Sequence, residues 1–457
     1  MSGFVTSIGA FLFAIAVLIA FHEYGHFWVA RRCGVKVLRY SIGFGKPLWM
    51  RRSGADQTEY VIAAIPLGGY VKMLDEREGE VPSEEVHRAF NQQSVGKRIA
   101  IVSAGPVFNF IFAIFAYALM YVVGVPGIKP VIGEVKEQSI AYNAGIRTGD
   151  EIIKVDGQRT VTWGSARMEM LQSALQNDVV TLEVGDSGSG TTGIPTRKIN
   201  LPVSGISTED KQAKLFSELG LQPYRPPAVL GELTPGAAAE RDGFKPDDEI
   251  TKVNGEKISD WVAWVKVIQA NPEKVLKVEF LRDGQVMQLD LKPDSFKDNE
   301  RIIGLIGARA KNIDYPKEMQ TIEQYSFWDG LTTGIVKTWQ MSVLTLKMIG
   351  NMIIGEVSVK NLSGPITIAT YAGYTASEGL PTFLSFLAIV SISLGVLNLL
   401  PIPLLDGGHL LFYVIEIVKG KALSEETQMR MQHVGIVLLG CLMALAFYND
   451  IHRLISG

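Results

Sequence analysis

Cysteine is scarce in this sequence, and so is net charge. Cys33 and Cys441 are the two cysteines among 457 residues, one beside a basic stretch and one in an apolar run, so they offer no disulfide framework. We interpret both as packing or surface thiols. The net charge of -3 gives no reason to expect a nucleic-acid partner.

Basic residues are missing from the start of the chain. No Lys or Arg precedes Arg31, and the run from Phe4 to Ala20 contains no charged residue. A secretory signal peptide normally starts with a basic region and has a shorter apolar core, so this pattern excludes a typical one. It predicts instead a retained transmembrane helix at about residues 4–30, long enough to cross a hydrocarbon core of roughly 30 Å.

Long apolar runs are what the sequence does contain. Hydrophobic residues make up 47% of the chain and charged residues 20%, which indicates a protein that is part membrane-embedded and part soluble. Besides the first span, uncharged runs at residues 101–123, 380–405 and 433–448 predict three more. We therefore expect a polytopic α-helical membrane protein with four transmembrane helices, which also contacts membrane lipid.

The first span carries an H-E-x-x-H motif, His22-Glu23-Tyr24-Gly25-His26. Two histidines four residues apart lie on one face of a helix and can bind one divalent ion, while the adjacent Glu can act on a water molecule. Ionisable groups inside an apolar span are costly, so their presence indicates a function. We predict a metal site with His22 and His26 as ligands and Glu23 as general base.

Positive charge is concentrated in the loop that follows. Twelve Lys or Arg occur from Arg31 to Arg98, whereas residues 1–30 contain none. The positive-inside rule places this loop in the cytoplasm and the N-terminus outside. The two histidines then lie toward the cytoplasmic side of the membrane.

Two segments of this loop, Val35–Tyr40 and Glu59–Met73, are rich in Val, Ile and Tyr and predict strands. Gly43 and Gly45 lie between them. These glycines are either turn residues or parts of a membrane-associated sheet that reaches back to the metal and offers its edge to an extended substrate. Both interpretations stay open at this stage.

An internal repeat with an offset of 98 residues follows the second span. Residues 149–153 (GDEII) match residues 247–251 (DDEIT), and residues 155–157 (VDG) match residues 253–255 (VNG). Each copy combines strands with a short Ala/Gly-rich helical turn, and so resembles a PDZ domain of the bacterial type. The resemblance implies two small α+β domains, near residues 127–223 and 225–310.

The function of these repeats has two alternatives. Leu219-Gly220-Leu221 and Ile303-Gly304-Leu305 are candidate edges for binding a peptide by strand addition. The repeats could equally be spacers or size filters. Beyond them, the amphipathic pattern of residues 327–355 contains Lys337 and Lys347, which predicts an interfacial helix rather than a span.

The third span ends in the sequence from Asn398 to Asp406, NLLPIPLLD. Because this span enters from the outside, its end reaches the depth of the two histidines. Asp406 is therefore the predicted third ligand, which leaves a fourth position for water as in catalytic zinc sites. Pro401 and Pro403 predict irregular backbone that could pair with a substrate strand.

These motifs, with G-P-V-F-N in the second span, resemble the site-2 intramembrane metalloproteases from end to end. The resemblance implies Zn²⁺ held by His22, His26 and Asp406, with Glu23 as general base. It links Asn398 and the Gly43–Gly45 segment to substrate handling. It also implies a bacterial inner-membrane protein with both termini and the repeats in the periplasm, cleaving single-span substrates already trimmed outside: an anti-sigma factor resembling RseA, and remnant signal peptides.

The expected division of the chain follows from these features. It comprises an N-terminal membrane half, two PDZ-like domains, an amphipathic helical linker and a C-terminal membrane half, at residues 1–126, 127–223, 225–310, 311–379 and 380–457. A non-enzymatic membrane scaffold that holds exported chains with its PDZ-like domains is the alternative function. Such a scaffold needs no metal and should tolerate Ala at all three predicted ligands.

Overall fold

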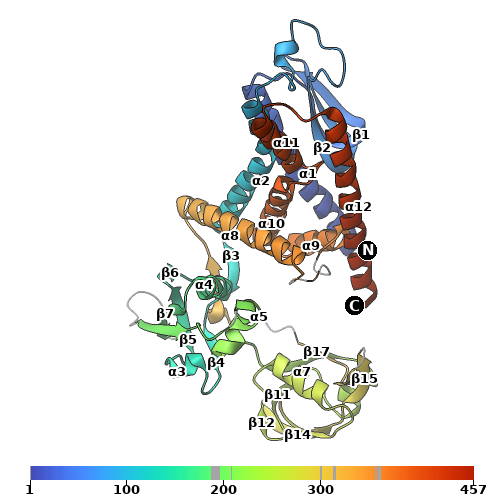
Figure 1. Ribbon diagram of the computed structural model, residues 1–457. Coiled ribbons are helices and arrows are strands. Elements are labelled where there is room, and N and C mark those ends of the chain that lie inside the picture. Colours follow the sequence, from blue (N-terminus) through green and yellow to red (C-terminus); the bar gives the residue numbers. More distant parts are fainter. Residues whose placement is uncertain are drawn as a thin grey trace. The chain divides into compact units, whose positions relative to one another are not determined.

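The computed structural model describes residues 2–186, 196–206, 208–298, 301–311, 315–355, 358 and 362–456. It divides into two compact units. One comprises Met1–Val125 and Gln324–Gly457, and the other comprises Pro126–Glu323. The first holds the long apolar helices and the second holds the two repeats (Figure 1).

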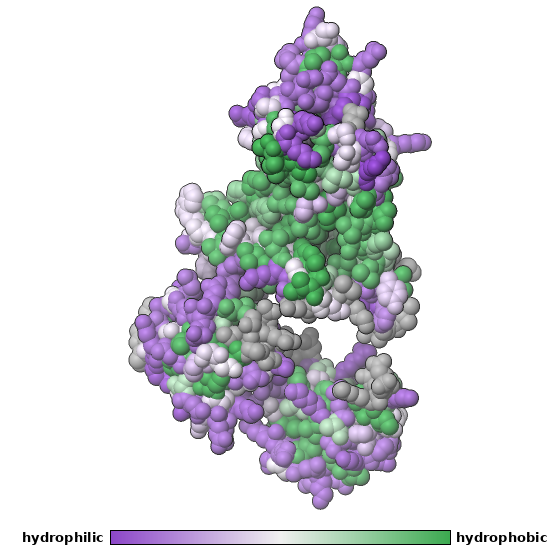
Figure 2. Space-filling view, viewed as in Figure 1, coloured by the Kyte–Doolittle hydropathy of each residue, from purple (hydrophilic) through white to green (hydrophobic). Residues whose placement is uncertain are grey.

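The first unit is a helical bundle with one β-hairpin. Its helices are α1 (Ser2–Arg32), α2 (Val95–Val123), α8 (Phe327–Ile353), α9 (Pro365–Ser377), α10 (Leu380–Leu399), α11 (Asp406–Lys419) and α12 (Glu425–Ser456), and a short 3-10 helix spans Val86–Arg88. Within the described residues, four stretches are long and apolar enough to cross a membrane: Val5–Arg32, Val95–Val123, Leu380–Leu399 and Glu426–Arg453. They form the broad hydrophobic region of this unit in Figure 2 and agree with the four predicted spans.

Helix α2 lies at the centre of this bundle, because α1, α8, α10 and α11 all pack on it. Ala113 and Ala116 of α2 share a buried cluster with Ala388 of α10. Small residues let membrane helices approach closely, and van der Waals packing then replaces the hydrophobic effect that lipid cannot supply. The same central helix supplies several groups of the site described below.

Helix α8 has the two-faced character predicted for residues 327–355. Gly330, Gly334 and Thr338 are buried at four-residue spacing, and the two glycines face backbone atoms of α2. Trp328 and Trp339 are more than two-thirds exposed. The helix therefore packs through a small-residue face and presents indole rings outward, which suits an interfacial position.

The hairpin is longer than the sequence predicted. Strand β1 (Val37–Ser53) pairs antiparallel with β2 (Thr58–Met73), so the expected end of the first strand at Tyr40 was wrong. Gly43 and Gly45 lie inside β1 with φ of +93° and +87°. Glycine adopts this left-handed conformation without a Cβ penalty, so the two residues kink the strand and shift its register instead of ending it.

The third span also ends earlier than expected. Helix α10 stops at Leu399, residues 400–405 are irregular, and Asp406 begins the separate helix α11. The prediction of irregular backbone around Pro401 and Pro403 is confirmed, whereas the placement of this segment within the span was wrong. Proline cannot donate the hydrogen bond that would continue the helix.

The second unit contains both repeats. The first comprises β4 (Ile132–Val135), α3 (Ile140–Asn143), β5 (Asp150–Val155), β6 (Gln158–Arg159), α4 (Trp163–Gln176), β7 (Val179–Asp186), β8 (Arg197–Pro202), α5 (Thr208–Leu219) and β9 (Leu221–Pro223). The second comprises β10 (Ala228–Leu233), α6 (Ala238–Arg241), β11 (Glu249–Val253), β12 (Glu256–Lys257), α7 (Trp261–Ala270), β13 (Leu276–Arg282), β14 (Gln285–Leu291), β15 (Asp294–Asp298), β16 (Arg301–Leu305) and β17 (Ala308–Ala310). Outside the repeats, β3 (Val125–Ile128) pairs with β18 (Gln320–Glu323), which follows a 3-10 turn at Lys317–Met319.

Each repeat closes a core of its own. The first has the sheet order β6-β5-β7-β8 with a separate β4-β9 pair, and Met170 of α4 is fully buried against it. The second has the order β14-β13-β11-β10-β17, and Trp264 of α7 is fully buried against it. In both, one helix covers the apolar face of a small antiparallel sheet.

The structure corrects one edge proposed from the repeat. The Lys136 amide donates to the carbonyl of Gly220 at 2.9 Å, and the equivalent Thr234 amide, 98 residues later, donates to Gly307 at 2.7 Å. Gly220 therefore corresponds to Gly307, not to Gly304. Gly304 instead packs against the last turn of α7, where its missing side chain leaves room for the carbonyl of Ile268.

Candidate metal centre

Three side chains from two distant parts of the chain meet inside the first unit. His22 and His26 lie one turn apart on α1, and Asp406 is the first residue of α11. Asp406 Oδ2 lies 3.3 Å from His22 Nε2 and 3.6 Å from His26 Nε2, and the two Nε2 atoms are 3.3 Å apart. One potential ligand atom from each residue lies within 4.8 Å of the others, which is close enough to share one ion.

The chemistry of this cluster fits a cation. Asp406 Oδ2 is buried and makes no hydrogen bond of adequate geometry within the described part of the chain. Burial alone would raise the pKa of the Asp406 carboxyl, but the nearby His22 and His26 outweigh burial and hold that pKa below its ordinary value. An ionised carboxylate oxygen between two imidazoles, without a well-formed hydrogen bond of its own, is a ready ligand for Zn²⁺.

Helix α2 fixes the orientation of His26. The ring nitrogen Nδ1 of His26 lies 2.8 Å from the carbonyl oxygen of Ile101, to which it can donate only when it carries the proton. That tautomer leaves a lone pair on Nε2, directed toward the other ligands. Gly105, one turn further on, makes room for the rings, because a Cβ there would collide with His26 Nε2 and lie 2.7 Å from His22 Cε1.

Asn109, another turn along the same face of α2, contacts the other imidazole. Nδ2 of its fully buried amide lies 3.2 Å from His22 Nδ1, whereas Oδ1 of the same amide has no hydrogen-bond partner within the described residues. A His that ligates through Nε2 carries its proton on Nδ1, and an amide oxygen can accept that proton. A 180° rotation of the Asn109 amide would bring Oδ1 to His22 Nδ1, where it could accept the proton of the ligating tautomer.

A partly buried ion pair fixes the helix that carries Asp406. The guanidinium of Arg98 on α2 contacts both carboxylate oxygens of Glu416 on α11, at 2.7 and 3.2 Å, and lies 4.9 Å from the ring centroid of Tyr413. Both charged side chains are at most 16% exposed. Such a bidentate contact constrains direction as well as distance, so α11 is held on α2 although residues 400–405 before it are irregular.

Glu23 lies beside these ligands in a cavity of about 340 Å³. The cavity is lined by α1, α2, the end of α10, the start of α11 and residues 69–73 of β2. Gly69 is needed here, since a Cβ on it would lie 2.9 Å from Cγ of Glu23. Strand β2 therefore packs directly against the side chain of Glu23, the predicted general base.

The residues predicted to handle substrate are placed differently. Asn398 lines the metal cavity, with Nδ2 3.5 Å from His22 Nε2. Pro401 and Pro403 lie in the irregular segment, whose last residues line the cavity while the prolines do not. Gly43 and Gly45 lie in the kinked part of β1 and are also outside the cavity lining.

Four groups of α2 were missed by reading motifs one at a time: Arg98, the carbonyl of Ile101, Gly105 and Asn109. Their spacing of three or four residues is a signal that could have found them, because it puts them on one helix face. Gly105 and Asn109 belong to the G-P-V-F-N motif noted in the second span. The carbonyl of Ile101 leaves no trace in the side-chain sequence.

Two histidines and a Glu on a membrane-length helix, joined by an Asp from a later helix, form the arrangement expected of a membrane-embedded metallopeptidase site. Comparison with known proteins agrees with this class. The model of peptidase family M50 matches residues 10–442, and the chain therefore belongs to that family.

Curated relatives match the chain over nearly its whole length. The chain is 45% identical to the Regulator of sigma-E protease RseP of Escherichia coli over 99% of this chain and all of that protein. It is 44% identical to the Protease RseP of Yersinia pestis over 99% and 100% of the two chains. A protein of Vibrio cholerae named "Putative zinc metalloprotease" is 44% identical over 97% and 98%. The chain is a metalloprotease with the character of an inner-membrane protein.

Proposed function

We propose that this metalloprotease uses Zn²⁺ to hydrolyse peptide bonds within the transmembrane segments of single-span membrane proteins. His22, His26 and Asp406 would hold the ion. The single observation that carries the proposal is the convergence of these three side chains, with a buried carboxylate oxygen that makes no well-formed hydrogen bond, inside a bundle of membrane-length helices. Bound Zn²⁺ would supply Lewis-acid activation of water.

Glu23 would move the protons of the reaction. It lines the same cavity as the three ligands, and it can take a proton from the attacking water and return it to the leaving amine. Asn109 and the Ile101 carbonyl would keep the histidines in the ligating tautomer throughout. The scaffold alternative uses none of these groups, and the metalloprotease family of the chain speaks against it.

The substrate must become extended before it is cut. A transmembrane helix hides its carbonyls and satisfies all its amides internally, so local unwinding would leave backbone groups without partners. Residues 69–73 of β2 and the irregular segment before Asp406 both line the cavity. Strand-like pairing with β2 would compensate the unwound segment, with Asn398 as a further contact and the Gly43–Gly45 kink shaping the sheet.

The substrates we propose are a pre-trimmed anti-sigma factor resembling RseA, in the extracytoplasmic stress response, and remnant signal peptides. The names of the RseP relatives support the stress-response assignment. The positive charge from Arg31 to Arg98 supports a cytoplasmic hairpin, with both termini and the repeats in the periplasm. Labelling of single introduced cysteines by an impermeant maleimide in intact cells tests this orientation, and labelling of residue 55 from outside would reverse it.

The repeats would act on substrate selection as PDZ-like domains. In each, a strand edge lies beside a helix, β9 beside α4 and β17 beside α7, as strand addition requires. Exclusion of substrates with bulky outer domains is compatible with the same fold. Peptide binding and size filtering therefore remain the two roles to be separated experimentally.

The decisive experiment is cleavage of a purified single-span substrate by the reconstituted protein, with mass spectrometry of both products. A bond broken inside the membrane segment, sensitive to chelation and restored by Zn²⁺, is the expected result. Cleavage confined to residues outside that segment would overturn the intramembrane assignment. Persistence of cleavage after complete metal removal would overturn the role of zinc.

A further inference from the structure

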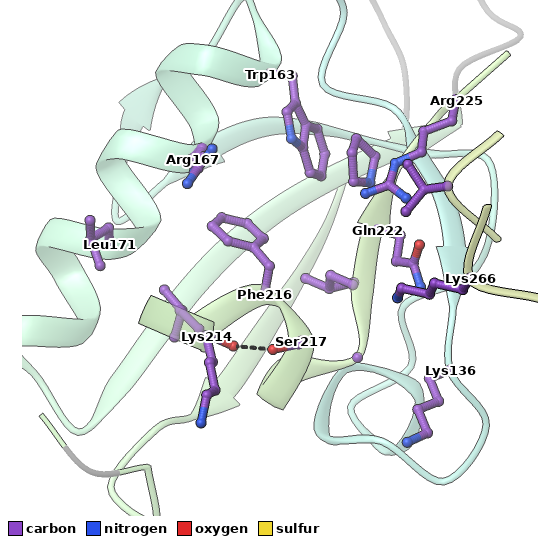
Figure 3. Close-up of a pocket in the computed structure, with 15 residues that line it drawn as sticks. Lys136, Trp163, Arg167, Leu171, Lys214, Phe216, Ser217, Gln222, Arg225 and Lys266 are labelled. Carbon is purple, nitrogen blue, oxygen red and sulfur yellow. Dashed lines mark hydrogen bonds between the residues drawn. The ribbon is translucent and has the colours of Figure 1, made fainter. Parts of the chain in front are cut away.

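The grooves of the two repeats differ in charge at equivalent positions. The groove of the first repeat, of about 530 Å³, lies between α4, α5 and β9, and Val262 and Lys266 of α7 in the second repeat complete its lining (Figure 3). Of the fifteen described residues that line it, five are Lys or Arg and none is Asp or Glu. The groove of the second repeat, of about 260 Å³, has one cation, Arg309, among twelve lining residues. The first groove therefore has a strongly positive lining.

The 98-residue offset identifies which positions create this difference. Trp163, Arg167 and Leu171 line the first groove from successive turns of α4. Their counterparts on α7 are Trp261, Val265 and Gln269, so Arg167 is replaced by Val265. Lys136 in turn corresponds to Thr234. Two groove cations thus have neutral counterparts on the same fold, which indicates that the fold itself does not require them.

Several of the groove cations are not neutralised by ion pairs. Lys136, Arg167 and Lys266 are exposed and form no ion pair within the described part of the chain. Arg225, by contrast, lies 3.4 Å from Asp260, and Lys214 already has a partner. A cluster of like charges around a concave site raises the local concentration of anions.

The floor of the groove is apolar and suits a polypeptide. Figure 3 shows Phe216 between the α4 side chains and β9, and its ring centroid lies 6.0 Å from that of Trp163. Strand β9 pairs with β4, and no other described strand occupies its second edge. An extended chain could lie along this edge, with apolar side chains on the aromatic floor and acidic ones toward the cations.

One backbone amide before β9 is not available to bind a chain end. The amide of Gly220 donates to the carbonyl of Ser217 at 3.2 Å, as the last turn of α5 closes. That amide is therefore already used and does not offer itself to a terminal carboxylate. Carboxylates in the groove would meet side-chain cations instead.

We propose that the groove of the first repeat binds an acidic, internal segment of an extended polypeptide, through Lys136 and Arg167 of that repeat and Lys266 of the adjoining α7. The second groove, lined by neutral residues at the matched positions, lacks this preference. The proposal deepens the selection role suggested for the repeats, but it does not depend on hydrolysis at the metal centre.

The test uses the full-length Glu23→Gln protein in a neutral detergent, so that binding is measured without cleavage. Fluorescence anisotropy reports binding of a labelled Glu/Asp-rich peptide containing a few Leu residues, in free-acid and amidated forms. We expect both forms to bind alike and to bind more weakly as salt rises. Replacing Lys136→Thr and Arg167→Val together, the residues of the second repeat, should weaken binding about three- to tenfold, as expected for losing two exposed charge contacts.

A matched control removes the same charge elsewhere. The pair Arg159→Gln and Lys257→Gln lies on the exposed strands β6 and β12, outside both groove linings, and should leave affinity unchanged. Equal weakening by both pairs would show that only net charge matters and would overturn the site. Equal binding of a Gln/Asn-substituted peptide, or binding of the free acid alone, would overturn recognition of internal acidic side chains.

A lipid is the remaining occupant to be tested. Vesicles containing phosphatidylglycerol that bind through Lys136 and Arg167, without competition by the acidic peptide, would assign the cations to a membrane surface and overturn the proposal. If an unlabelled acidic peptide displaces the labelled peptide from the protein and the vesicles do not, the proposal is supported. Cleavage of a substrate by the protein with native Glu23 remains a separate measurement, so failure of either proposal can be recognised.

Discussion

The membrane unit and the repeat unit organise their functional groups in opposite ways. In the membrane unit, His22, His26 and Asp406 come from α1 and α11, and hydrogen bonds or an ion pair from α2 fix the imidazoles and the helix carrying Asp406. In the repeat unit, most of the groove side chains that carry charge are exposed on the two separately packed cores. Buried polar groups cannot relax toward water, so we expect single changes to act steeply in the first unit and gradually in the second.

Removal of the third ligand should have the largest effect. Asp406→Ala deletes the carboxylate between the two imidazoles, so the purified protein should lose both stoichiometric zinc and proteolysis. Zinc content by elemental analysis and cleavage of a single-span substrate measure the two losses. Asp290→Ala, at an exposed position on β14 of the repeat unit, is the control and should keep both. Full zinc content in the Asp406→Ala protein would remove this residue from the ligand set.

Loss of the general base should have the second-largest effect on activity. Glu23→Gln keeps the shape of the side chain but cannot accept the proton, so the rate should fall by about 10²- to 10⁴-fold while zinc content is retained. Single-turnover cleavage measures the rate. Glu78→Gln, an exposed residue of the loop after β2, should leave the rate unchanged. Unaltered cleavage by the Glu23 variant would refute its role.

Replacement of Asn109 should have an intermediate effect on zinc binding. This variant tests whether buried groups around the metal are more sensitive to change than exposed ones. Asn109→Ala leaves His22 Nδ1 without its partner, so zinc affinity should fall about 10- to 100-fold. Competition with a chromophoric chelator measures that affinity. Asn109→Asp retains an acceptor and should restore most of it, whereas the Ala and Asp variants behaving alike would indicate a packing role.

A useful control for this variant lies in the same bundle. The hydroxyl of Ser391 donates to the backbone carbonyl of Asn109 at 2.8 Å, without a hydrogen bond to either imidazole. Ser391→Ala should therefore leave zinc affinity near that of the unaltered protein. A loss equal to that of Asn109→Ala would show that the bundle, rather than the amide, controls the metal.

Deletion of residues 127–310 should have the smallest effect on chemistry. The membrane unit is compact by itself and contains every predicted metal ligand, so cleavage of pre-trimmed substrates should persist. If the repeats are a size filter, the shortened protein should also cut untrimmed substrates. Gel analysis of paired trimmed and untrimmed substrates measures this selectivity. Continued rejection of the untrimmed substrate would favour peptide binding or a structural role for the repeats. Loss of all cleavage would show that the membrane unit does not work without the repeats, against the expected independence of the two units.

Much of the membrane unit could be predicted because lipid leaves few alternatives. Uncharged runs of sufficient length must form helices there, since an unsatisfied backbone group is too costly. The predicted ends of strands and helices were less accurate near glycine and proline residues. Gly43 and Gly45 were compatible with a turn yet lie within a continuous strand, because pairing with β2 continues past the kink.

The repeat shows the same limit. Its offset of 98 residues was readable, but the second edge was placed at Gly304 when the hydrogen bond from Thr234 identifies Gly307. Local motifs such as X-Gly-X recur by chance within a few residues. Only pairing with the distant β10 distinguishes one glycine from the other.

By itself, the sequence determined the residues that can do chemistry and the helix that carries most of them. His22, Glu23 and His26 are adjacent on one helix, so their relationship is fixed by helical geometry. The tertiary structure decided how they are held, because Asn109, Arg98 and the Ile101 carbonyl act through distances set by packing of α1 and α11 on α2. It also decided that Lys136 and Arg167, 31 positions apart, line one groove, since long-range contacts leave no periodic signal in a single chain.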